Sequence, residues 1–565
     1  MLNFIKNIFK KEESDLFFRV FNDLKSIVGD ECRLDTPPEH IEADFSITTS
    51  NPKDNPKLVE KIKEKELGYI EDVKIAGPFI NLFLKKDLFF DSVLNNIYKR
   101  QEDYGSSNVR KKIFIEYSSP NIAKPLGVGH LRSLVIGESL SRIYKKAGYK
   151  VFKENYLGDW GTQFGKMIYA YQKWGDEEKI KQNPTKELKT LYVKFQKESE
   201  KDKTIEDNAR EIFNSLEKGD EELLKLWKKF RELSIEEFKE VYNRFGVEFD
   251  NYSGESHYVK SSLEIIEEIK NKGLCEEGEG ESLIVELEDL PSFLIRKKDG
   301  STLYLTRDIA ALRDRVKKHN PDKLIYVVGN EQSLHFQQLF KISEALGIIN
   351  KNNVEHVANG LILIDGKKMS TRKGTTINLS QLLDESVQRS RNVIEEKNPS
   401  LSEEEKAKIS EIIGVGSVVY NDLRHYRLKD VNFEWDKVLN FEGGSAVYLQ
   451  YTYARINSIL NKLNQKSIPS LGEYVFEDEV EFDIAKHLFS FPKVIKNSCD
   501  RKEPHIICNY LEDLAKHFNS FYNKVSIINT EDENLKASRI ALAHSTALVI
   551  KEGLRILSVD VPEKM

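Results

Sequence analysis

The sequence predicts an α/β protein built on a parallel sheet, with helical segments added to it. Residues 111–117 (KKIFIEY) and 151–157 (VFKENYL) are typical of buried strands. Between them, residues 130–148 place apolar side chains at helical spacing, and Gly148 stands where a helix C-terminal cap is expected. A strand, loop, helix and strand in this order predict a βαβ unit, which binds ligands at the carboxyl ends of its strands.

Residues 1–105 predict a separate small α/β module. Residues 57–67 (KLVEKIKEKEL) have a helical pattern, and residues 73–76 (VKIA) and 79–84 (FINLFL) are typical of strands. A turn at residues 105–108 ends the module.

Residues 176–245 interrupt the α/β pattern with charged helical sequence. Within residues 221–245 apolar side chains recur every three or four positions, and Ser234 and Glu237 have the spacing of a capping box. We therefore expect an inserted helical hairpin with a helix start at Ser234. Its runs of charge are interpreted as solvated helix faces rather than RNA contacts.

The sheet is expected to be completed after this insertion, and the chain beyond about residue 375 is almost wholly helical in period, which predicts a C-terminal bundle. The strands and helices expected before the bundle are strands at 282–287, 293–298 and 301–306, a helix from Asp308, a strand at 323–328, a helix after Ser333 and a strand at 356–364.

Composition limits the class of protein. A chain of 565 residues with 32% charged and 39% hydrophobic residues predicts several globular domains. The net charge of -6 argues against general electrostatic binding of nucleic acid, although a local basic face is compatible with it. Neither a membrane helix nor a signal peptide is indicated, so we expect a cytoplasmic protein. The four cysteines are scattered, which predicts neither a disulfide framework nor a structural metal site.

Two loops carry most of the chemical signal. The strand at 111–117 runs into a loop with Gly127 and Gly129 just before the helix at His130, a place where backbone N–H groups and the helix dipole favour phosphate. The second loop, residues 366–374 (GKKMSTRKG), combines four cations, two hydroxyls and two glycines, which suits a polyphosphate. Either loop alone is compatible with an ordinary turn, but the pair, about 240 residues apart, predicts a nucleotide site.

These loops also carry a family resemblance. Residues 127–133 (GVGHLRS) resemble the HIGH motif and residues 368–372 (KMSTR) the KMSKS motif of class I aminoacyl-tRNA synthetases. The strings that are similar to the arginyl enzymes span nearly the whole chain: EYSSPNIAKP at 116–125, NYLGDWGTQFG at 155–165, YSGES at 252–256, LYLTRDIAA at 303–311, YLQYTYAR at 448–455 and VPEKM at 561–565.

The resemblance implies a Rossmann-like class I synthetase catalytic domain with a small α/β N-terminal domain, a helical insertion and an all-α C-terminal anticodon-binding bundle. It implies ligation of L-arginine to tRNA(Arg) through an arginyl-adenylate, with ATP arriving as its Mg²⁺ complex, by a monomer. The implied domains are a tRNA-elbow-binding domain at 1–105, the catalytic domain at 106–375, a connector that contacts the tRNA stem at 376–440 and the anticodon-binding domain at 441–565.

The resemblance also assigns site residues. The catalytic residues would be Lys124, His130, Lys368, Ser370 and Arg372. The ATP-binding residues would be Gly127, Gly129, His130, Lys368, Met369 and Ser370. The arginine-binding residues would be Glu116, Ser119, Pro120, Asn121, His130, Glu255, Tyr304, Asp308 and Gln332. The tRNA-binding residues would be Phe79, Asn81, Tyr451, Arg455, Tyr522 and Met565.

The arginine assignment has a physical basis, because carboxylates accept paired N–H bonds from a planar guanidinium in a geometry that lysine cannot reproduce. Glu255, Tyr304 and Asp308 would hold the guanidinium, while Glu116 and Asn121 would face the α-amino group. The residues alone leave simpler interpretations open: Asp308 as a helix N-cap, Tyr304 as an inward strand aromatic, and the tRNA residues as packing.

Two departures from the family pattern keep a rival hypothesis open. Gly127 replaces the first histidine of the HIGH motif, and Thr371 and Arg372 stand where the last KMSKS lysine would follow. Lys124 resembles the lysine that arginyl enzymes of this kind use instead. The rivals are a non-catalytic RNA-binding relative and a different class I ligase.

Overall fold

A five-stranded parallel sheet lies at the centre of the molecule. The computed structural model describes residues 16–565 except 30–32, 36, 38–40, 42, 50, 123, 183, 288, 299, 365–366, 369–376 and 441. The strand order is β12-β11-β5-β6-β7, and all four pairings are parallel. The strands are β5 (Lys112–Tyr117), β6 (Lys150–Leu157), β7 (Asn251–Gly254), β11 (Lys323–Gly329) and β12 (Val354–Asn359). The predicted parallel sheet is confirmed.

The predicted βαβ unit consists of β5, the helix α5 (Leu131–Lys146) and β6, with a short turn η3 (Val128–His130) before the helix. A Cβ atom on Gly137 would lie 2.3 Å from the ring of Tyr117, so only glycine lets α5 pack this closely on β5. Gly148, with φ of +85°, reverses the chain after the helix as its sequence position predicts.

The N-terminal region forms its own antiparallel sheet in the order β1-β2-β4-β3. Its elements are α2 (Leu16–Val28), β1 (Arg33–Asp35), β2 (Phe45–Thr48), η1 (Pro52–Asp54), α3 (Asn55–Glu64), β3 (Ile70–Ala76), β4 (Phe79–Leu84), α4 (Lys86–Arg100) and η2 (Gln101–Asp103). This agrees with the predicted α/β module.

The insertion has the predicted bounds but contains more helices than the predicted hairpin. After α6 (Thr162–Trp174) come α7 (Glu177–Gln182), α8 (Pro184–Lys201), α9 (Thr204–Glu217) and α10 (Glu221–Arg244). The predicted helix start at Ser234 is wrong, because Ser234 lies inside α10 and its hydroxyl donates to the Phe230 carbonyl at 2.7 Å. Asp220 caps this helix instead, accepting from two backbone N–H groups. A serine can bond back along its own helix, so spacing alone does not identify a cap.

The strands expected directly after the insertion do not join the central sheet. After η4 (Glu255–Tyr258) and α11 (Val259–Asn271), the strands β8 (Glu276–Glu277), β9 (Leu283–Leu287) and β10 (Leu290–Arg296) form a separate antiparallel sheet. The strand predicted at 301–306 is wrong, since α12 (Tyr304–His319) begins there, four residues before the predicted helix start. Leu305, Ile309 and Leu312 are buried at helical spacing, and this burial overrides the local strand pattern.

Of these predicted strands, only 323–328 and the first part of 356–364 join the central sheet, with η5 (Asn330–Gln332), α13 (Ser333–Ala345) and η6 (Lys351–Asn353) between them. The strand predicted at 356–364 is wrong in its second part, because residues 362–364 belong to another sheet. A small three-stranded sheet follows, formed by β13 (Ile362–Ile364), β14 (Lys367–Lys368) and β15 (Val431–Phe433), in which β13 and β15 are parallel. The remaining helices form the predicted C-terminal bundle: α14 (Leu379–Lys397), α15 (Glu403–Leu423), α16 (Trp435–Val438), α17 (Ala446–Lys462), α18 (Glu479–Arg501), α19 (His505–Lys524) and α20 (Glu533–Ile556).

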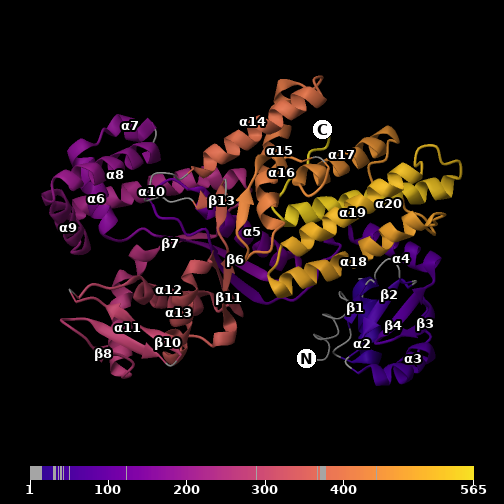
Figure 1. Cartoon of the computed structure of the whole chain (residues 1–565), viewed down its shortest axis with the longest axis horizontal. Helices are drawn as coiled ribbons and strands as arrows, with labels where there is room; N and C mark the ends of the chain where they lie inside the picture. The colour runs from indigo at the N-terminus through magenta and orange to yellow at the C-terminus, as the bar shows by residue number, and fades with distance from the viewer. Residues whose placement is uncertain are drawn as a thin grey trace.

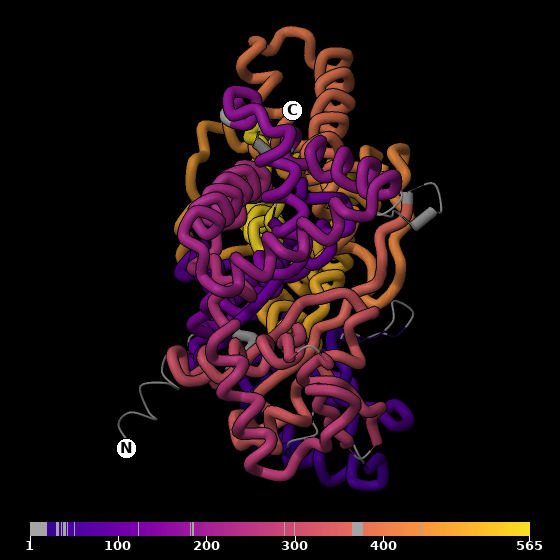
Figure 2. The backbone as a smooth tube through the Cα atoms, turned by 90° about the vertical axis from the view of Figure 1, so that its left-hand side faces the viewer, coloured from indigo at the N-terminus to yellow at the C-terminus, as the bar shows by residue number. Residues whose placement is uncertain are grey.

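The N-terminal module packs against α18 of the C-terminal bundle, on the opposite side of the molecule from the insertion (Figure 1). Phe489 on α18 contacts Phe45 and Phe89 of the N-terminal module, with ring centroids 5.3 and 5.0 Å apart. Viewed from the side of the insertion, helices α6–α10 lie above the segment that contains α11–α13 (Figure 2). Among the described residues, no helix is both long and apolar enough to cross a membrane.

Candidate active site

A cavity of about 380 Å³ opens beside the central sheet, and it brings together residues that lie far apart in the sequence. Seven of the residues predicted to bind arginine line it: Glu116, Ser119, Asn121, Glu255, Tyr304, Asp308 and Gln332. We call this cavity the arginine pocket. Pro120 and His130, from the same prediction, are not among its lining residues.

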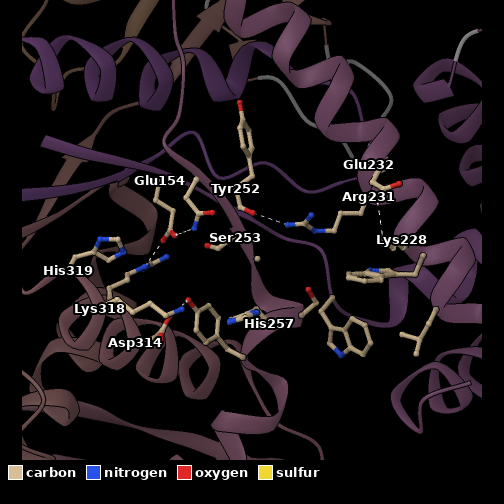
Figure 3. A pocket seen from close by; sticks show the side chains of 18 residues that line it. Glu154, Lys228, Arg231, Glu232, Tyr252, Ser253, His257, Asp314, Lys318 and His319 are labelled. Carbon is tan, nitrogen blue, oxygen red and sulfur yellow. Dashed lines mark hydrogen bonds and ion pairs between the residues drawn. The ribbon is translucent and has the colours of Figure 1, made fainter. Parts of the chain in front are cut away.

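A second cavity, of about 630 Å³, is larger but contains none of the predicted site residues. It lies between α10, β7 and α12, and Glu154, Arg231, His257 and Lys318 are among the side chains drawn around it in Figure 3. Volume alone would therefore have pointed away from the predicted chemistry.

Glu116 is held in the arginine pocket by a buried charge network. The side chain is 4% exposed at the end of β5, and its carboxylate pairs with Arg315 of α12 at 2.6 Å. The Ser119 hydroxyl also donates to it, at 3.2 Å. Burial raises the pKa of Glu116 to about 7, since the attraction of Arg315 is opposed by the negative charges of Glu154 and Asp308. The carboxylate therefore becomes charged close to neutral pH.

Two further acids, Glu255 and Asp308, line the pocket. Glu255 pairs with Arg307 at 3.1 Å, and burial raises its pKa to about 8 despite that partner. The Asp308 carboxylate lies 2.7 Å from Nε2 of His335. Both acids thus have a protein partner already, and an arginine ligand would join or displace it.

Tyr304 and Asp308 do not follow the simpler interpretations of the sequence. Tyr304 is the first residue of α12 rather than an inward strand residue, and it is 59% exposed. Leu303 takes the N-cap position of α12, so Asp308 lies inside the helix and is free to face the pocket.

The loop after β5 is held in a strained shape. Ser118 and Ser119 have φ of 72° and 40°, in the left-handed region that residues other than glycine rarely adopt. Such residues cost about 1–3 kcal/mol each and persist only where the surroundings fix them. Here the Ser118 N–H donates to the Ser133 hydroxyl at 2.9 Å, and its own hydroxyl bonds that of Tyr242 at 2.9 Å. In this backbone conformation, Ser119 and Asn121 line the pocket.

The HIGH-like loop forms backbone hydrogen bonds with the chain that follows the second predicted phosphate loop. The Val128 N–H donates to the Ile377 carbonyl at 3.1 Å, and the Leu379 N–H to the Leu126 carbonyl at 2.8 Å. The HIGH-like loop therefore pairs with the chain directly after residues 366–374. Lys368 belongs to β14, but its side chain and the predicted residues Met369, Ser370 and Arg372 lie outside the described residues.

His130 and Lys124 stand apart from the arginine pocket. Nδ1 of His130 lies 3.2 Å from both the N–H and the carbonyl of Gly127, while Gly129 is exposed beside it. Burial, with a smaller effect of the Lys124 charge, lowers the pKa of His130 and keeps it neutral at pH 7. The Lys124 ammonium lies 5.4 Å from the ring centroid of Tyr192 on α8.

Three of the predicted tRNA residues form one exposed cluster on the bundle. The guanidinium of Arg455 lies 4.9 Å from the ring centroid of Tyr451 and 5.3 Å from that of Tyr522. The two rings are 40% and 41% exposed, and Asn519 fixes the guanidinium at 2.8 Å. We call these three residues the Tyr–Arg–Tyr cluster.

The other predicted tRNA residues, Phe79, Asn81 and Met565, differ in their exposure and in their surroundings. Phe79 is 42% exposed on β4, but Asn81 is buried and accepts a hydrogen bond from Ser46 at 2.6 Å. Met565 is half-buried against a small apolar group that includes Ile394 and Val447.

Sequence reasoning missed several residues of the pocket, including Tyr156, Tyr326, His335 and Phe336 in its lining and Arg307 and Arg315 behind it. A signal for Arg315 was present, because it follows Asp308 by seven positions and so lies on the same face of the helix. His335 similarly follows Gln332 by three positions. Among the described residues, no three His, Cys, Asp or Glu side chains are grouped so as to hold a metal ion.

Comparison with family models matches two parts of the chain. Residues 93–435 match the model described as tRNA synthetases class I (R), catalytic domain, and residues 449–565 match the DALR anticodon binding domain. The first match covers the central sheet and the arginine pocket, and the second covers the Tyr–Arg–Tyr cluster.

Similar proteins agree with this placement. The arginine–tRNA ligase of Halothermothrix orenii is 41% identical over 99% of this chain and 100% of its own length. That of Clostridium acetobutylicum is 43% identical over 94% of this chain and 96% of its own. The arginyl-tRNA synthetase structure from Thermus thermophilus superposes with a TM-score of 0.81 at 20% identity, covering 97% of this chain and all of the other. The structure from Plasmodium falciparum does so with a TM-score of 0.78 at 24% identity over 99% of each chain.

The two superpositions establish the fold alone, whereas the sequence relatives establish the family. The catalytic-domain match covers more than half of the residues, and the curated relatives are similar from end to end. The chain therefore belongs to the arginyl-tRNA synthetase family of class I tRNA synthetases.

Proposed function

We propose that this protein ligates L-arginine to its tRNA at the expense of ATP, with the arginine pocket as its amino-acid site. The observation that carries the proposal is the convergence of seven predicted arginine-binding residues, from four separate stretches of the chain, on one cavity. A non-catalytic relative would have no need to keep two buried carboxyl groups and their arginine partners in that cavity.

Recognition of arginine divides between the two ends of the pocket. Glu255 and Asp308 supply two acidic groups for the guanidinium, whose five N–H donors need several acceptors in one plane. Tyr304 covers this end and Gln332 closes it. At the other end, Glu116 and Asn121 receive the α-amino group. Lysine carries a single compact ammonium, so it cannot make paired, coplanar hydrogen bonds to both acids at once.

The chemistry needs no nucleophilic side chain. An oxygen of the arginine carboxylate attacks the α-phosphorus of ATP, and pyrophosphate leaves to give the arginyl-adenylate. The 2′-hydroxyl of the terminal adenosine of the tRNA then attacks the carbonyl carbon, and AMP leaves. The protein contributes position and charge stabilisation.

For that step we propose Lys124, His130 and residues 367–374 as the groups that hold the ATP phosphates. The backbone pairing between residues 126–128 and 377–379 supports this, because it attaches the chain that follows residues 367–374 to the HIGH-like loop. Neutral His130 can donate one hydrogen bond without bringing in a further charge. Magnesium enters as part of the ATP substrate and is held by phosphates and water.

The tRNA is proposed to span from the N-terminal module to the C-terminal bundle. Exposed aromatic rings suit bases that are not stacked in a helix, and both Phe79 and the Tyr–Arg–Tyr cluster provide such rings. The boundaries at residues 105, 375 and 440 and the stem contact at 376–440 belong to this proposal.

Arginine-dependent exchange of pyrophosphate into ATP, measured with and without tRNA(Arg), tests the function. We expect exchange that requires arginine, followed by charging of the tRNA. No exchange in either condition, together with tight tRNA binding, would favour the non-catalytic relative. A monomer in the cytoplasm is also proposed; a mass of about 65 kDa by light scattering checks the monomer against the chain mass of 65.4 kDa.

A further inference from the structure

We propose that Arg315 is a positioning residue for the amino-acid substrate: it holds Glu116 charged and oriented towards the α-amino group by bridging it to Glu154. The inference rests on the proposed function and concerns a residue that touches no substrate itself. It deepens that function by explaining how the part of the pocket that receives the α-amino group is kept able to bind it.

The first support is the register of the central sheet. Glu116 on β5 is paired in register with Glu154 on β6 and with Tyr326 on β11. The same row continues to Asn251 on β7 and to His356 on β12. Residues that are opposite each other in parallel strands point to the same face, so five polar side chains form one line across the sheet.

The second support is the way in which Arg315 crosses this row. Its NH1 atom lies 2.6 Å from Glu116, and its Nε atom lies 2.6 Å from Glu154. NH1 also donates to the Tyr326 hydroxyl at 3.2 Å, and the guanidinium lies 4.8 Å from the ring centroid of Tyr156. Arg315 is 3% exposed, so this geometry is fixed by packing.

The third support is electrostatic. Glu116 and Glu154 are both buried on neighbouring strands, where two negative charges repel each other strongly in a low dielectric. Glu154 accepts further from Asn251 at 2.8 Å and lines the second cavity (Figure 3) but not the arginine pocket. Arg315 is therefore shared between a carboxylate that faces the substrate and one that does not.

The charged and polar groups around Glu116 determine whether a substitution raises or lowers the pKa of Glu116. Burial and the charges of Glu154 and Asp308 raise the pKa of Glu116, whereas Arg315 and the Ser119 hydroxyl lower it. The Tyr326 and Tyr156 hydroxyls stay neutral because burial raises the pKa of both. Loss of Arg315 must then raise the pKa of Glu116, and loss of the Glu154 charge must lower it.

The first experiment replaces Arg315 and compares two ligands. One is arginine, and the other is 5-guanidinopentanoate, which has the same chain and guanidinium but no α-amino group. For Arg315→Met at pH 7 we expect KM for arginine to rise about 30-fold, as for truncation of a buried charge pair. The Ki of 5-guanidinopentanoate against arginine should stay unchanged. A purely structural role would weaken both ligands together, and that result would overturn the proposal.

Arg313→Met is the matched control, because Arg313 lies on the same helix and pairs with Glu268 outside the arginine pocket. It should leave both constants unchanged. Arg315→Lys keeps one charge but cannot bridge both carboxylates, so its KM for arginine should lie between those of the native protein and Arg315→Met.

The second experiment needs no loss of the buried arginine, so it stands even if Arg315→Met fails to fold. In Glu154→Gln, Arg315 serves Glu116 alone, and the pH below which KM for arginine rises should move down. In Arg315→Met or Arg315→Lys the pH below which KM for arginine rises should move up. Opposite shifts of this pH in the two variants support the proposal, and an unchanged pH dependence of KM in Glu154→Gln overturns it.

The failure of this inference can be told apart from the failure of the proposed function. If the native protein shows no arginine-dependent exchange, the proposed function itself has failed. If native exchange is normal and only these shifts are absent, the role of Arg315 alone is refuted.

Discussion

The arginine pocket and the Tyr–Arg–Tyr cluster use arginine and tyrosine side chains in opposite ways. In the pocket, Arg307 and Arg315 are buried and paired with carboxylates at 3.1 and 2.6 Å. In the cluster, Arg455 lies between two rings that are about two-fifths exposed. Buried pairs fix the geometry for one small ligand, while open ring faces accept bases of varied shape. Changes in the pocket should therefore be severe and particular to arginine, and changes in the cluster graded and particular to tRNA.

The largest effect is expected for Asp308→Asn. The amide keeps the size of the side chain but removes a charge from the guanidinium end, so kcat/KM for arginine should fall about 1000-fold. Steady-state pyrophosphate exchange measures this. Asp314→Asn is the control on the same helix, because Asp314 pairs with Lys318 at 2.8 Å and lines the other cavity. Equal losses in both variants would mean that the helix, not the pocket charge, is at fault.

Lys124→Met should act on the chemical step. Removing one cation that stabilises developing phosphate charge should lower kcat of adenylation about 100-fold and leave KM for arginine unchanged. Single-turnover formation of adenylate separates the two quantities. A rise in KM for arginine with normal kcat would contradict this role. Lys124 would then serve only as a loop residue that contacts Tyr192.

The affinity for arginine should depend on pH near neutrality. The pKa values of Glu116 and Glu255 are raised to about 7 and about 8, and a cationic ligand needs their charged forms. KM for arginine should therefore fall at least about tenfold as the pH rises from about 6 to about 8.5. Initial rates over this range give the profile. A flat KM would show that both acids are already charged at pH 6.

Tyr522→Ala tests the other region. Loss of one stacking ring should raise KM for tRNA about fivefold and leave pyrophosphate exchange at saturating tRNA unaffected. Tyr522→Phe keeps the ring and should behave like the native protein. If the phenylalanine variant is as weak as the alanine variant, the hydroxyl rather than stacking makes the contact.

The smallest effect is expected for Gly127→His, which restores the family histidine. Gly127 has φ of -90° and ψ of 163°, an extended conformation that any residue adopts, so a side chain adds no backbone strain. Activity should be equal or higher, by less than about fivefold. A large loss in adenylation rate would show that this position needs glycine for close packing.

The sequence predicted the fold class well, together with half of the residues that line the arginine pocket. The helix after Gly129, the strands on either side of it and the C-terminal helices follow from local periodicity, and the structure confirms them. Predictions failed where two patterns compete locally. Residues 301–306 have a strand-like composition, but α12 begins at Tyr304, and Ser234 has a capping spacing inside a long helix. In both places burial against distant segments decided the outcome.

By itself, the sequence determined the class of chemistry, because the motifs that carry it are short, contiguous and recognisable without a partner. Glu255, Tyr304 and Asp308 belong to such strings. Only the tertiary structure decided which charged side chains are buried next to one another. Glu116, Glu154 and Arg315 come from three separate elements, and their pairing depends on the register of two parallel strands and the rotation of α12. Strand register and helix rotation are set by packing over the whole core, so no local pattern encodes the bridge.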